Sequence, residues 1–258
     1  MENKVAIVTG STAGIGFAIA KNLAAKGAKV VINGRTIEKL KKAEQEIESF
    51  GGKILAIQAD ATDEAEIKRI ISETVQYFGG IDILVNNAAM TGVGVSVAEM
   101  PVETWDAVMN VNLRGVFLFC KAVIPHLTKQ KWGRIISISG LSGKSPLAFG
   151  AADAVSKAGV LALTRSLAAE LGALNITVNA VLPGIQPKTE SGQDFIARIA
   201  KAYHTDSETI LNATIQRTLA KRHESMDEVA ETVAFLCTDG AGAITGQSLN
   251  VNCGLATF

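Results

Sequence analysis

Short runs of β-branched and other apolar residues alternate along the chain with longer segments whose apolar residues recur every three or four positions. The short runs predict strands at 4–9, 28–33, 53–59, 82–87, 134–139, 176–181 and 248–252. The longer segments predict helices at 15–26, 36–50, 63–78, 103–129, 151–172 and 226–238. Strands that are apolar on both sides are buried between two layers, so this alternation predicts a parallel sheet with helices on both faces and right-handed crossovers.

We therefore expect an α/β protein with a single domain over residues 1–258, built on a doubly wound sheet of seven parallel strands. No low-complexity tract or linker divides the chain. The segment 183–225 departs from the rhythm, because it begins "PGIQPKTESGQ" and is helical in composition but contains no strand. We expect it to form a lid or rim over the carboxyl ends of the strands, where such folds bind ligands.

Composition narrows the class of partner. The chain has 258 residues, of which 48% are hydrophobic, and its 25 basic and 25 acidic residues give a formal net charge of zero. A neutral chain with only 5% aromatic residues is not expected to bind nucleic acid or an anionic membrane, which leaves a small-molecule substrate. Cys120, Cys237 and Cys253 are widely separated, so neither a disulfide framework nor a metal site is predicted.

The first ten residues, "MENKVAIVTG", lead directly into the first predicted strand. They contain no signal-peptide pattern, and we expect no apolar stretch long enough to cross a bilayer. The sequence therefore predicts a soluble cytoplasmic protein with no membrane partner.

A glycine-rich segment, "TGSTAGIG" from Thr9 to Gly16, follows the first strand and opens the first helix. Glycines in such a turn let the backbone approach a pyrophosphate, and the helix N-terminus supplies free N–H groups and positive partial charge. An ordinary structural turn is the alternative. If the segment is a phosphate loop, its cofactor-binding residues are Gly10, Ser11, Thr12, Gly14, Ile15 and Gly16.

The second strand ends "VVINGRT", without the acidic residue that would bind the ribose hydroxyls of NAD. Gly34 leaves space there, and the guanidinium of Arg35 suits a 2′-phosphate, so NADP is expected rather than NAD. Arg35 also fits a solvated charge in a first helical turn. Asp60, after the third strand, fits either a contact with the adenine amino group or a cap for the helix 63–78.

Several motifs together resemble the classical short-chain dehydrogenases/reductases, over essentially the whole chain. The matching segments are "TGSTAGIG", "NNAA" (86–89), "VNLRGVF", "GRIISIS", "SKAG", "VNAVLPG" and "ITGQSLNVNCG". The resemblance implies a Rossmann fold, a nicotinamide cofactor and hydride transfer between that cofactor and a carbonyl or alcohol. It also implies cofactor contacts at Asp60, Ala61, Asn87, Ala88, Lys157, Pro183, Gly184 and Ile185.

The long helices 103–129 and 151–172 carry apolar residues on more than one face. In the family such helices build a dimer interface, commonly within a tetramer. We therefore expect a homo-oligomer, either a dimer or a tetramer.

The resemblance also implies a catalytic set of four residues. A tyrosine exchanges a proton with the substrate, a lysine four residues later lowers the tyrosine pKa and holds the nicotinamide ribose, a serine thirteen residues earlier binds the substrate oxygen, and an asparagine positions a water. Asn112 and Lys157 match this set. Asp153 stands at the tyrosine position and Gly140 at the serine position. These four positions are the predicted catalytic residues.

Smaller departures occur elsewhere. Ala89 stands where the family has glycine, and Asn252 and Cys253 stand where it has aspartate and glycine. Lys188 occupies the position of a threonine that contacts the nicotinamide amide, and Thr189 follows one place later.

Asp153 cannot simply replace the phenol, because a carboxyl group is ionised near neutral pH and a lysine one helical turn away favours that charged form. Loss of a positioned acid lowers a rate by about 10²- to 10⁴-fold. An ion pair between Asp153 and Lys157 beside an intact cofactor site is the first expectation. The alternatives are that the carboxylate serves as a base in another reaction or that a donor comes from elsewhere, with Tyr203, His204 and Ser142 as candidates.

The sequence hypothesis is thus an NADP-binding oxidoreductase with weak or no activity in the ordinary reaction. A non-catalytic cofactor-binding protein with a regulatory or structural role is one alternative. An enzyme of altered chemistry on the same scaffold is another, because a fold does not fix a reaction. No motif in 183–225 identifies a substrate.

Overall fold

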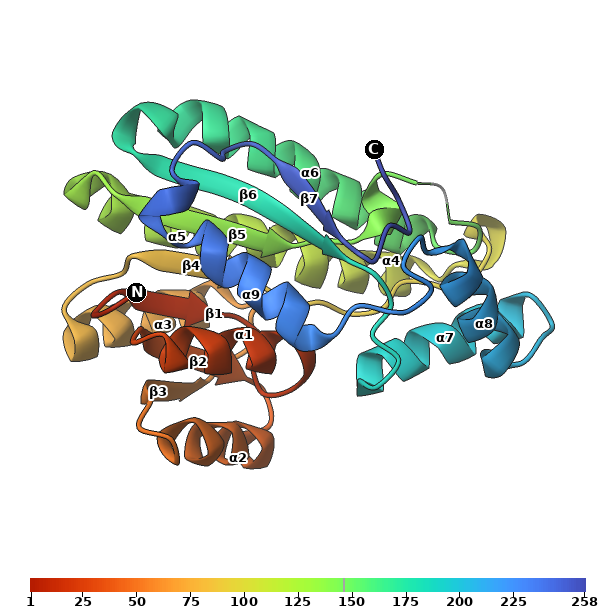
Figure 1. The fold of residues 1–258 in the computed structure, drawn as a ribbon, viewed down its shortest axis with the longest axis horizontal. Helices are drawn as coiled ribbons and strands as arrows, with labels where there is room; N and C mark the ends of the chain where they lie inside the picture. Colours follow the sequence, from red (N-terminus) through yellow and green to blue (C-terminus); the bar gives the residue numbers. More distant parts are fainter. Residues whose placement is uncertain (146) are drawn as a thin grey trace.

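The computed structural model describes residues 1–145 and 147–258, and a single parallel sheet runs through the middle of this part of the chain (Figure 1). Its neighbouring strands follow the order β3-β2-β1-β4-β5-β6-β7. The strands are β1 (Val5–Val8), β2 (Lys29–Gly34), β3 (Lys53–Gln58), β4 (Ile83–Asn86), β5 (Gly133–Ile138), β6 (Ile176–Pro183) and β7 (Ser248–Val251). Every neighbouring pair is parallel, so the predicted seven-stranded doubly wound sheet is confirmed.

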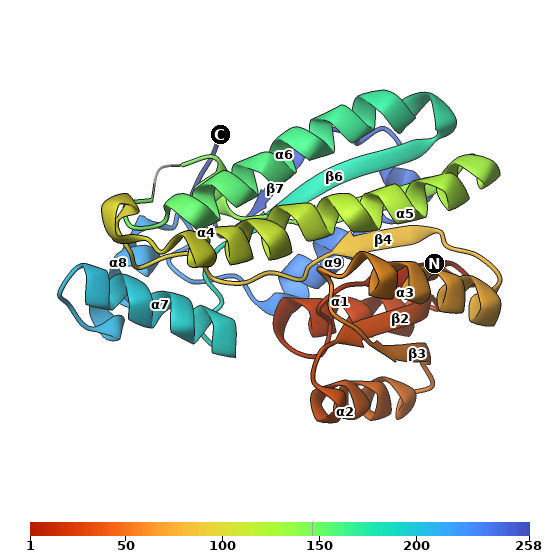
Figure 2. The ribbon, with the colours of Figure 1, turned by 180° about the vertical axis from the view of Figure 1, so that it is seen from behind.

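Helices cover both faces of the sheet, as Figures 1 and 2 show from opposite sides. They are α1 (Gly14–Ala25), α2 (Ile37–Glu48), α3 (Glu64–Phe78), α4 (Val102–Met109), α5 (Gly115–Gln130), α6 (Ala151–Leu171), α7 (Glu190–Ala202), α8 (Ser207–Arg217) and α9 (Met226–Leu236). One apolar core lies between the sheet and α1, α2 and α9, and the other lies between the sheet and α3, α5 and α6. This is the predicted single-domain Rossmann arrangement.

The alternation of side chains along β1 shows why both faces are buried. Ala6 and Val8 point into the core beneath α1 and α9, whereas Ile7 points into the core beneath α3 and α5. β1 pairs with β2 on one side and with β4 on the other, so the strand order reverses there. A crevice opens at the carboxyl ends of strands at such a reversal, and this places the ligand site.

The predicted helix 103–129 is divided in two. A π-helical turn at Asn110–Arg114 separates α4 from α5. No proline or glycine interrupts "NVNLR", so the sequence pattern did not reveal the break. π-helical turns are frequent at functional sites, and this one carries Asn112.

By length and composition alone, the stretch Val102–Gln130 could cross a membrane, with a mean hydropathy of 1.5, and the sequence analysis did not count it. In the structure 44% of this apolar window is buried inside the protein, and α5 packs on β4 and β5. The buried core helices of soluble proteins pass the same test, so this one stretch is only weak evidence for a membrane span.

The segment 183–225 forms α7 and α8, which project past the carboxyl ends of the strands (Figure 1). Thr189 caps α7 by accepting a hydrogen bond from Gly192 N, and Asp206 caps α8 by accepting one from Thr209 N. The two helices pack against each other. The segment is helical, as its composition predicted.

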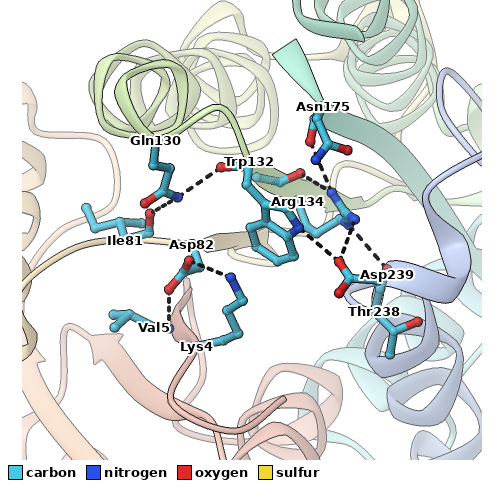
Figure 3. A network of polar contacts seen from close by, with 11 residues as sticks. Lys4, Val5, Ile81, Asp82, Gln130, Trp132, Arg134, Asn175, Thr238 and Asp239 are labelled. Carbon is cyan, nitrogen blue, oxygen red and sulfur yellow. Dashed lines mark hydrogen bonds and ion pairs between the residues drawn. The ribbon is translucent and has the colours of Figure 1, made fainter. Parts of the chain in front are cut away.

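The opposite end of the sheet is closed by a polar network around Arg134, shown in Figure 3. This side chain is 1% exposed, and its guanidinium donates to the carbonyl oxygens of Gly133, Asn175 and Thr238. It also pairs with Asp239 at 3.4 Å. The network ties β5 to the segments before β6 and after α9, and it uses no residue of the carboxyl end.

Candidate functional site

The glycine-rich loop after β1 is held so close to its neighbours that two of its residues must be glycine. A Cβ atom on Gly10, whose φ is +60°, would lie 2.8 Å from the Cα of Ala88. A Cβ atom on Gly16 would overlap Asn87 Nδ2 and lie 2.6 Å from the carbonyl oxygen of Gly10. The loop from β1 and the loop from β4 are therefore packed directly against each other.

Side chains that the sequence analysis did not select fix this loop. Asn33, which is 1% exposed at the end of β2, accepts a hydrogen bond from Gly10 N at 3.0 Å. The hydroxyl of Thr9 accepts from the backbone N–H groups of Asn87 and Ala88. In the sequence, the feature that could have indicated this role is the position of Asn33, a polar residue at the end of an otherwise apolar strand.

Predicted cofactor-binding residues near this loop have mixed orientations. Ser11 is fully buried and its hydroxyl donates to Val8 O at 2.6 Å, so the side chain points into the protein. Asn87 uses its amide to donate to the carbonyl oxygens of Thr9 and Gly10. Both side chains therefore shape the loop. Their backbone N–H groups are also used within the protein, because Ser11 N donates to Asn33 O and Asn87 N donates to the hydroxyl of Thr9.

The N-terminus of α1 is suited to an anion. The residue before it, Ala13, provides no side-chain cap, and Gly14 adopts a φ of +60° at the start of the helix. The first N–H groups of α1, including those of Ile15 and Gly16, are therefore left for another acceptor. A phosphate group at this point would meet both these donors and the positive end of the helix dipole.

The residues expected to recognise the adenosine end lie after β2 and β3. Arg35 is exposed. The space predicted at Gly34 is filled, because a Cβ there would lie 2.5 Å from Thr12 Cγ2. Gly34 thus accommodates Thr12 of the phosphate loop, which corrects the expectation that it leaves room for the ligand.

Asp60 forms a local turn and does not cap the following helix. Its carboxylate accepts hydrogen bonds from the backbone N–H and hydroxyl of Thr62, at 2.8 and 2.7 Å. Burial opposes its ionisation, but these hydrogen bonds and the charge of Arg35 outweigh burial and lower the pKa of Asp60. The cap of α3 is Asp63, which corrects one of the two alternatives for Asp60. Ala61, the next residue, packs its carbonyl against Gly115 of α5.

Asn112 lies at the centre of the site and is 2% exposed. Its Oδ1 accepts from Met90 N at 2.8 Å, and its Nδ2 donates to Met90 O at 3.0 Å and to Ser156 Oγ at 3.2 Å. Both amide hydrogens are used, so the side chain joins the loop after β4 to α6. If Asn112 positions a water, as the resemblance implies, its side chain can do so only by accepting a further hydrogen bond at Oδ1.

Asp153 and Lys157 do not form the ion pair that their spacing predicted. Among the ion pairs of the described residues, none joins them. Instead, Asp153 Oδ2 accepts a hydrogen bond of 2.6 Å from Ser142 Oγ, and Lys157 Nζ donates to Ile138 O at 3.4 Å. The partner of the Asp153 carboxylate is therefore Ser142, from the turn after β5, and not Lys157 of the same helix.

The electrostatic environment of this pair is set by burial. Asp153 is 9% exposed and lies in the first turn of α6, where the helix dipole favours a negative charge. Burial lowers the pKa of Lys157, and the nearby charge of Asp153 partly restores it. The site therefore holds one carboxylate and one ammonium group about one helical turn apart.

Gly140 leaves an open position beside this pair. A Cβ on Gly140 would meet Ser142 Oγ at 3.6 Å and Lys157 Cγ at 3.8 Å, which are ordinary contact distances. Its φ of −168° is extended backbone that any residue adopts. A serine therefore fits at this position without moving the backbone.

The loop after β6 is anchored by a buried carboxyl group that the sequence analysis missed. Glu224 is 5% exposed and accepts a hydrogen bond of 2.5 Å from Gln186 Nε2. A Cβ on Gly184 would lie 2.9 Å from Glu224 Oε2. Burial raises the pKa of Glu224. Glu224 thus packs against the loop that contains the predicted cofactor-binding residues Pro183, Gly184 and Ile185.

Two departures from the family pattern have visible consequences at the end of β7. Cys253 adopts a φ of +53°, a conformation that favours glycine, which is the residue expected at this position. Asn252 is 3% exposed, and neither atom of its amide has a partner within the described part of the chain.

The alternative proton donors are spread over the molecule. Tyr203 ends α7 and packs edge-on against Phe149, with ring centroids 5.5 Å apart, which brings the lid to the loop that leads into α6. His204 follows it with a φ of +52°. Tyr77, which is the other of the two tyrosines in the sequence and was not among these candidates, is 65% exposed at the end of α3, away from the carboxyl edge of the sheet. Of the candidates, only Ser142 contacts Asp153.

The chain is similar to known proteins over almost its whole length. A family model described as Enoyl-(Acyl carrier protein) reductase matches residues 10–256. A 3-oxoacyl-[acyl-carrier-protein] reductase of Synechocystis is 40% identical, over 99% of this chain and 98% of its own. The chain is a short-chain dehydrogenase/reductase.

Other members of the family have different substrates and cofactors. The (2S)-[(R)-hydroxy(phenyl)methyl]succinyl-CoA dehydrogenase subunit BbsD of Thauera aromatica is 36% identical, over 100% of this chain and 98% of its own. The crystal structure of an actinorhodin polyketide ketoreductase variant with NADPH superposes with a TM-score of 0.94 at 34% identity, over 99% of this chain and 98% of that one. An NAD+-bound xylitol dehydrogenase also gives 0.94, at 30% identity, over 98% and 99%.

The chain therefore has the fold of the short-chain dehydrogenases/reductases and belongs to this family of oxidoreductases. The N-terminus of α1 has no side-chain cap, and the glycine-rich loop before it lets a ligand approach the backbone closely. Both features fit the pyrophosphate of a dinucleotide. Among the described residues, no group of three His, Cys, Asp or Glu side chains could hold a metal ion.

Proposed function

We propose that this short-chain dehydrogenase/reductase binds NADP and is weak or inactive in ordinary carbonyl reduction. The observation that carries the proposal is the arrangement around Asp153. The residue at the position of the proton-donating phenol is a buried carboxylate that already accepts a hydrogen bond from Ser142, and the position of the family's serine is Gly140.

A bound nicotinamide would supply the hydride, and the residues of this chain would have to manage the proton. Asp153 lies in the first turn of α6, one helical turn from Lys157. A carboxylate that accepts from Ser142 cannot also donate through the same oxygen. The site therefore lacks an acid at the point where a substrate oxygen would need one.

NADP is proposed on two supports. Arg35 is an exposed guanidinium at the end of β2, where NAD-specific sites use an acidic residue. The actinorhodin ketoreductase structure, with which this chain superposes at a TM-score of 0.94, contains NADPH. In this site the loop Gly10–Gly16 would hold the phosphates and Lys157 would hold the nicotinamide ribose. The nicotinamide end would be held by Pro183, Gly184 and Ile185.

We also propose that 183–225 acts as a lid on the substrate side. Its first residues contact the cofactor loop, because a Cβ on Gly14 would lie 3.5 Å from Thr189 Cγ2. An ion pair of 2.9 Å between Lys39 and Glu190 joins α7 to α2. Tyr203 meets Phe149 at the other end. If Tyr203 were a replacement donor, Tyr203→Phe would abolish residual turnover, and unchanged turnover would exclude that role.

A homo-oligomer is proposed from the exposed apolar side chains of the long helices. Phe117 of α5 is 49% exposed and Val155 of α6 is 48% exposed, so each of the two long helices presents an apolar side chain that a second copy could cover. Light scattering coupled to size exclusion should give a dimer or tetramer, and a monomer at micromolar concentration would contradict the proposal.

The decisive experiment restores both missing groups. The double variant Gly140→Ser with Asp153→Tyr should oxidise NADPH in the presence of ketones at least about 100-fold faster than the unaltered chain, because a positioned acid alone contributes about that factor. The contact distances around Gly140 allow the serine. Asp153→Phe with Gly140→Ala is the matched control, since it fills the same space without either hydroxyl.

Three outcomes separate the possibilities. Gain of activity in the double variant but not in its control supports the proposal. Brisk NADPH-linked reduction of a simple ketone by the unaltered chain would overturn the claim of weak activity. Failure of the unaltered chain to bind NADP or NAD would overturn the cofactor proposal.

A further inference from the structure

A nicotinamide ring changes its charge with its oxidation state. The oxidised ring carries one positive charge, whereas the reduced ring is neutral. A fixed charge beside the ring therefore favours one of the two forms, and the preference is stronger where water is excluded. In this chain two side chains supply such charges from α6, the ammonium group of Lys157 and the carboxylate of Asp153.

We propose that Asp153 makes this site select the oxidised nucleotide, NADP+, over NADPH. The inference rests on the proposed function, since it requires that NADP binds with its ribose at Lys157. A site that has a neutral phenol at position 153 presents only the lysine charge, which repels an oxidised ring. Here the carboxylate, at the position from which the phenol serves the substrate beside the ring, attracts an oxidised ring more strongly than the lysine, held at the ribose, repels it. The balance therefore moves toward the cationic form of the nucleotide.

The carboxylate is held by one neighbour from another element, because Ser142, in the turn after β5, donates to Asp153 Oδ2 at 2.6 Å. The backbone of Asp153 is held as well: its carbonyl accepts from the hydroxyl of Ser156 in the same helix at 2.9 Å, and its N–H donates to Gly92 O at 3.4 Å. With the backbone and one carboxylate oxygen both engaged, the charge stays in place when the ring changes its oxidation state.

Screening of this charge is limited. Asp153 is 9% exposed, and its partner Ser142 is only partly exposed. Residues 153 and 157 are one helical turn apart, with about 5–6 Å between Cβ atoms at this spacing, so a ribose held by Lys157 would bring the nicotinamide into the neighbourhood of Asp153. Opposite charges at that distance, in the dielectric of a partly buried site, change a binding constant by about 5- to 50-fold.

The selection has a functional consequence. The form that binds more tightly is the one that cannot deliver a hydride to a ketone, so this site would retain NADP+ and release NADPH. Occupancy would then follow the ratio of NADP+ to NADPH around the protein. A protein with this behaviour reports on the redox state of its cofactor pool, in agreement with the loss of the proton donor.

Equilibrium binding of the two nucleotides to the full chain tests the inference. Dissociation constants for NADP+ and NADPH are measured by calorimetry, and the ratio of the NADPH value to the NADP+ value is compared between chains. The unaltered chain should give a ratio above 1. Asp153→Asn, which keeps the size and the acceptor for Ser142, should lower the ratio by about 5- to 50-fold.

Three further variants control the comparison. Glu170→Gln removes one negative charge from the same helix about 25 Å away and should leave the ratio unchanged. Asp153→Glu keeps the charge and should keep the ratio above that of Asp153→Asn. Ser142→Ala removes the hydrogen bond but not the charge and should give an intermediate ratio.

The outcomes for the two proposals differ. If neither nucleotide binds, the proposed function fails. If both bind but Asp153→Asn leaves the ratio unchanged, the selection by Asp153 is wrong. If Asp153→Asn does not fold, the unaltered chain alone decides, because NADPH binding as tight as NADP+ binding, or tighter, overturns the inference.

Discussion

Ser142 Oγ donates a hydrogen bond of 2.6 Å to Asp153 Oδ2, and this bond joins the turn after β5 to the first turn of α6. The bond connects two elements and places a hydroxyl group and a carboxyl group in direct contact, at a position where Asp153 is 9% exposed.

Because the phosphate loop packs so closely against its neighbours, adding one methyl group at Gly16 should strongly weaken nucleotide binding and stability. Gly16→Ala would place Cβ on top of Asn87 Nδ2 and 2.6 Å from Gly10 O, so the loop must shift. We expect a loss of nucleotide affinity of at least about 10-fold and a lower melting temperature. Gly80→Ala is the control, because nothing lies within 4 Å of a Cβ there. Equal effects of the two variants would contradict this account.

Cofactor choice depends on Arg35. Replacement by alanine removes a charged donor to a 2′-phosphate, and we expect the affinity for NADP to fall by about 10- to 100-fold while the affinity for NAD is unchanged. Lys42→Ala removes a positive charge from α2, where it is also exposed, and controls for net charge. Titration of both nucleotides measures the effect. An unaltered chain that binds NAD more tightly than NADP would show that Arg35 does not select the cofactor.

The network at the amino end of the sheet predicts a large stability effect far from the site. Arg134→Met removes a fully buried guanidinium and leaves the buried carbonyl oxygen of Gly133, and those of Asn175 and Thr238, without this donor. We expect about 2–4 kcal/mol lower free energy of unfolding. Asp239→Asn should cost less than about 1 kcal/mol, because Asp239 is 87% exposed. Urea denaturation compares the two, and the reverse order would contradict the role given to Arg134.

The buried carboxyl of Glu224 predicts a pH dependence. Burial raises the pKa of Glu224 above its ordinary value of 4.5, so between that value and the raised pKa the folded state binds more protons than the unfolded state. The contribution of this group to stability is therefore full below about pH 4.5 and is lost as the pH rises through the raised pKa. In Glu224→Gln this loss should be absent.

Urea denaturation at several pH values from about 4.5 to about 7.5 measures the difference. The free energy of unfolding of the unaltered chain should fall relative to that of Glu224→Gln as the pH rises. Glu103→Gln, a change at an exposed residue of α4, should run parallel to the unaltered chain. A gap between Glu224→Gln and the unaltered chain that does not change with pH would refute the assignment.

The positions of the central strands were predictable because these strands are buried on both faces and are therefore continuous apolar runs, as in "VAIV" of β1. The ion pair predicted for Asp153 and Lys157 used only their spacing within one helix. Its failure shows why local spacing was insufficient, since Ser142 arrives from a different element. Asn33 and Glu224 were missed for the same reason, because each supports a loop far from it in the sequence.

The π-helical turn at Asn110–Arg114 is sensitive to chain length in a way that ordinary loops are not. Removing a single residue there would restore regular winding and rotate α4 against α5 by about 100°. Asn112 would then leave the gap between Met90 and Ser156. When sequences of this family are aligned, a one-residue gap at this turn should therefore be scored as a loss of the site's architecture, even where every motif around it is intact.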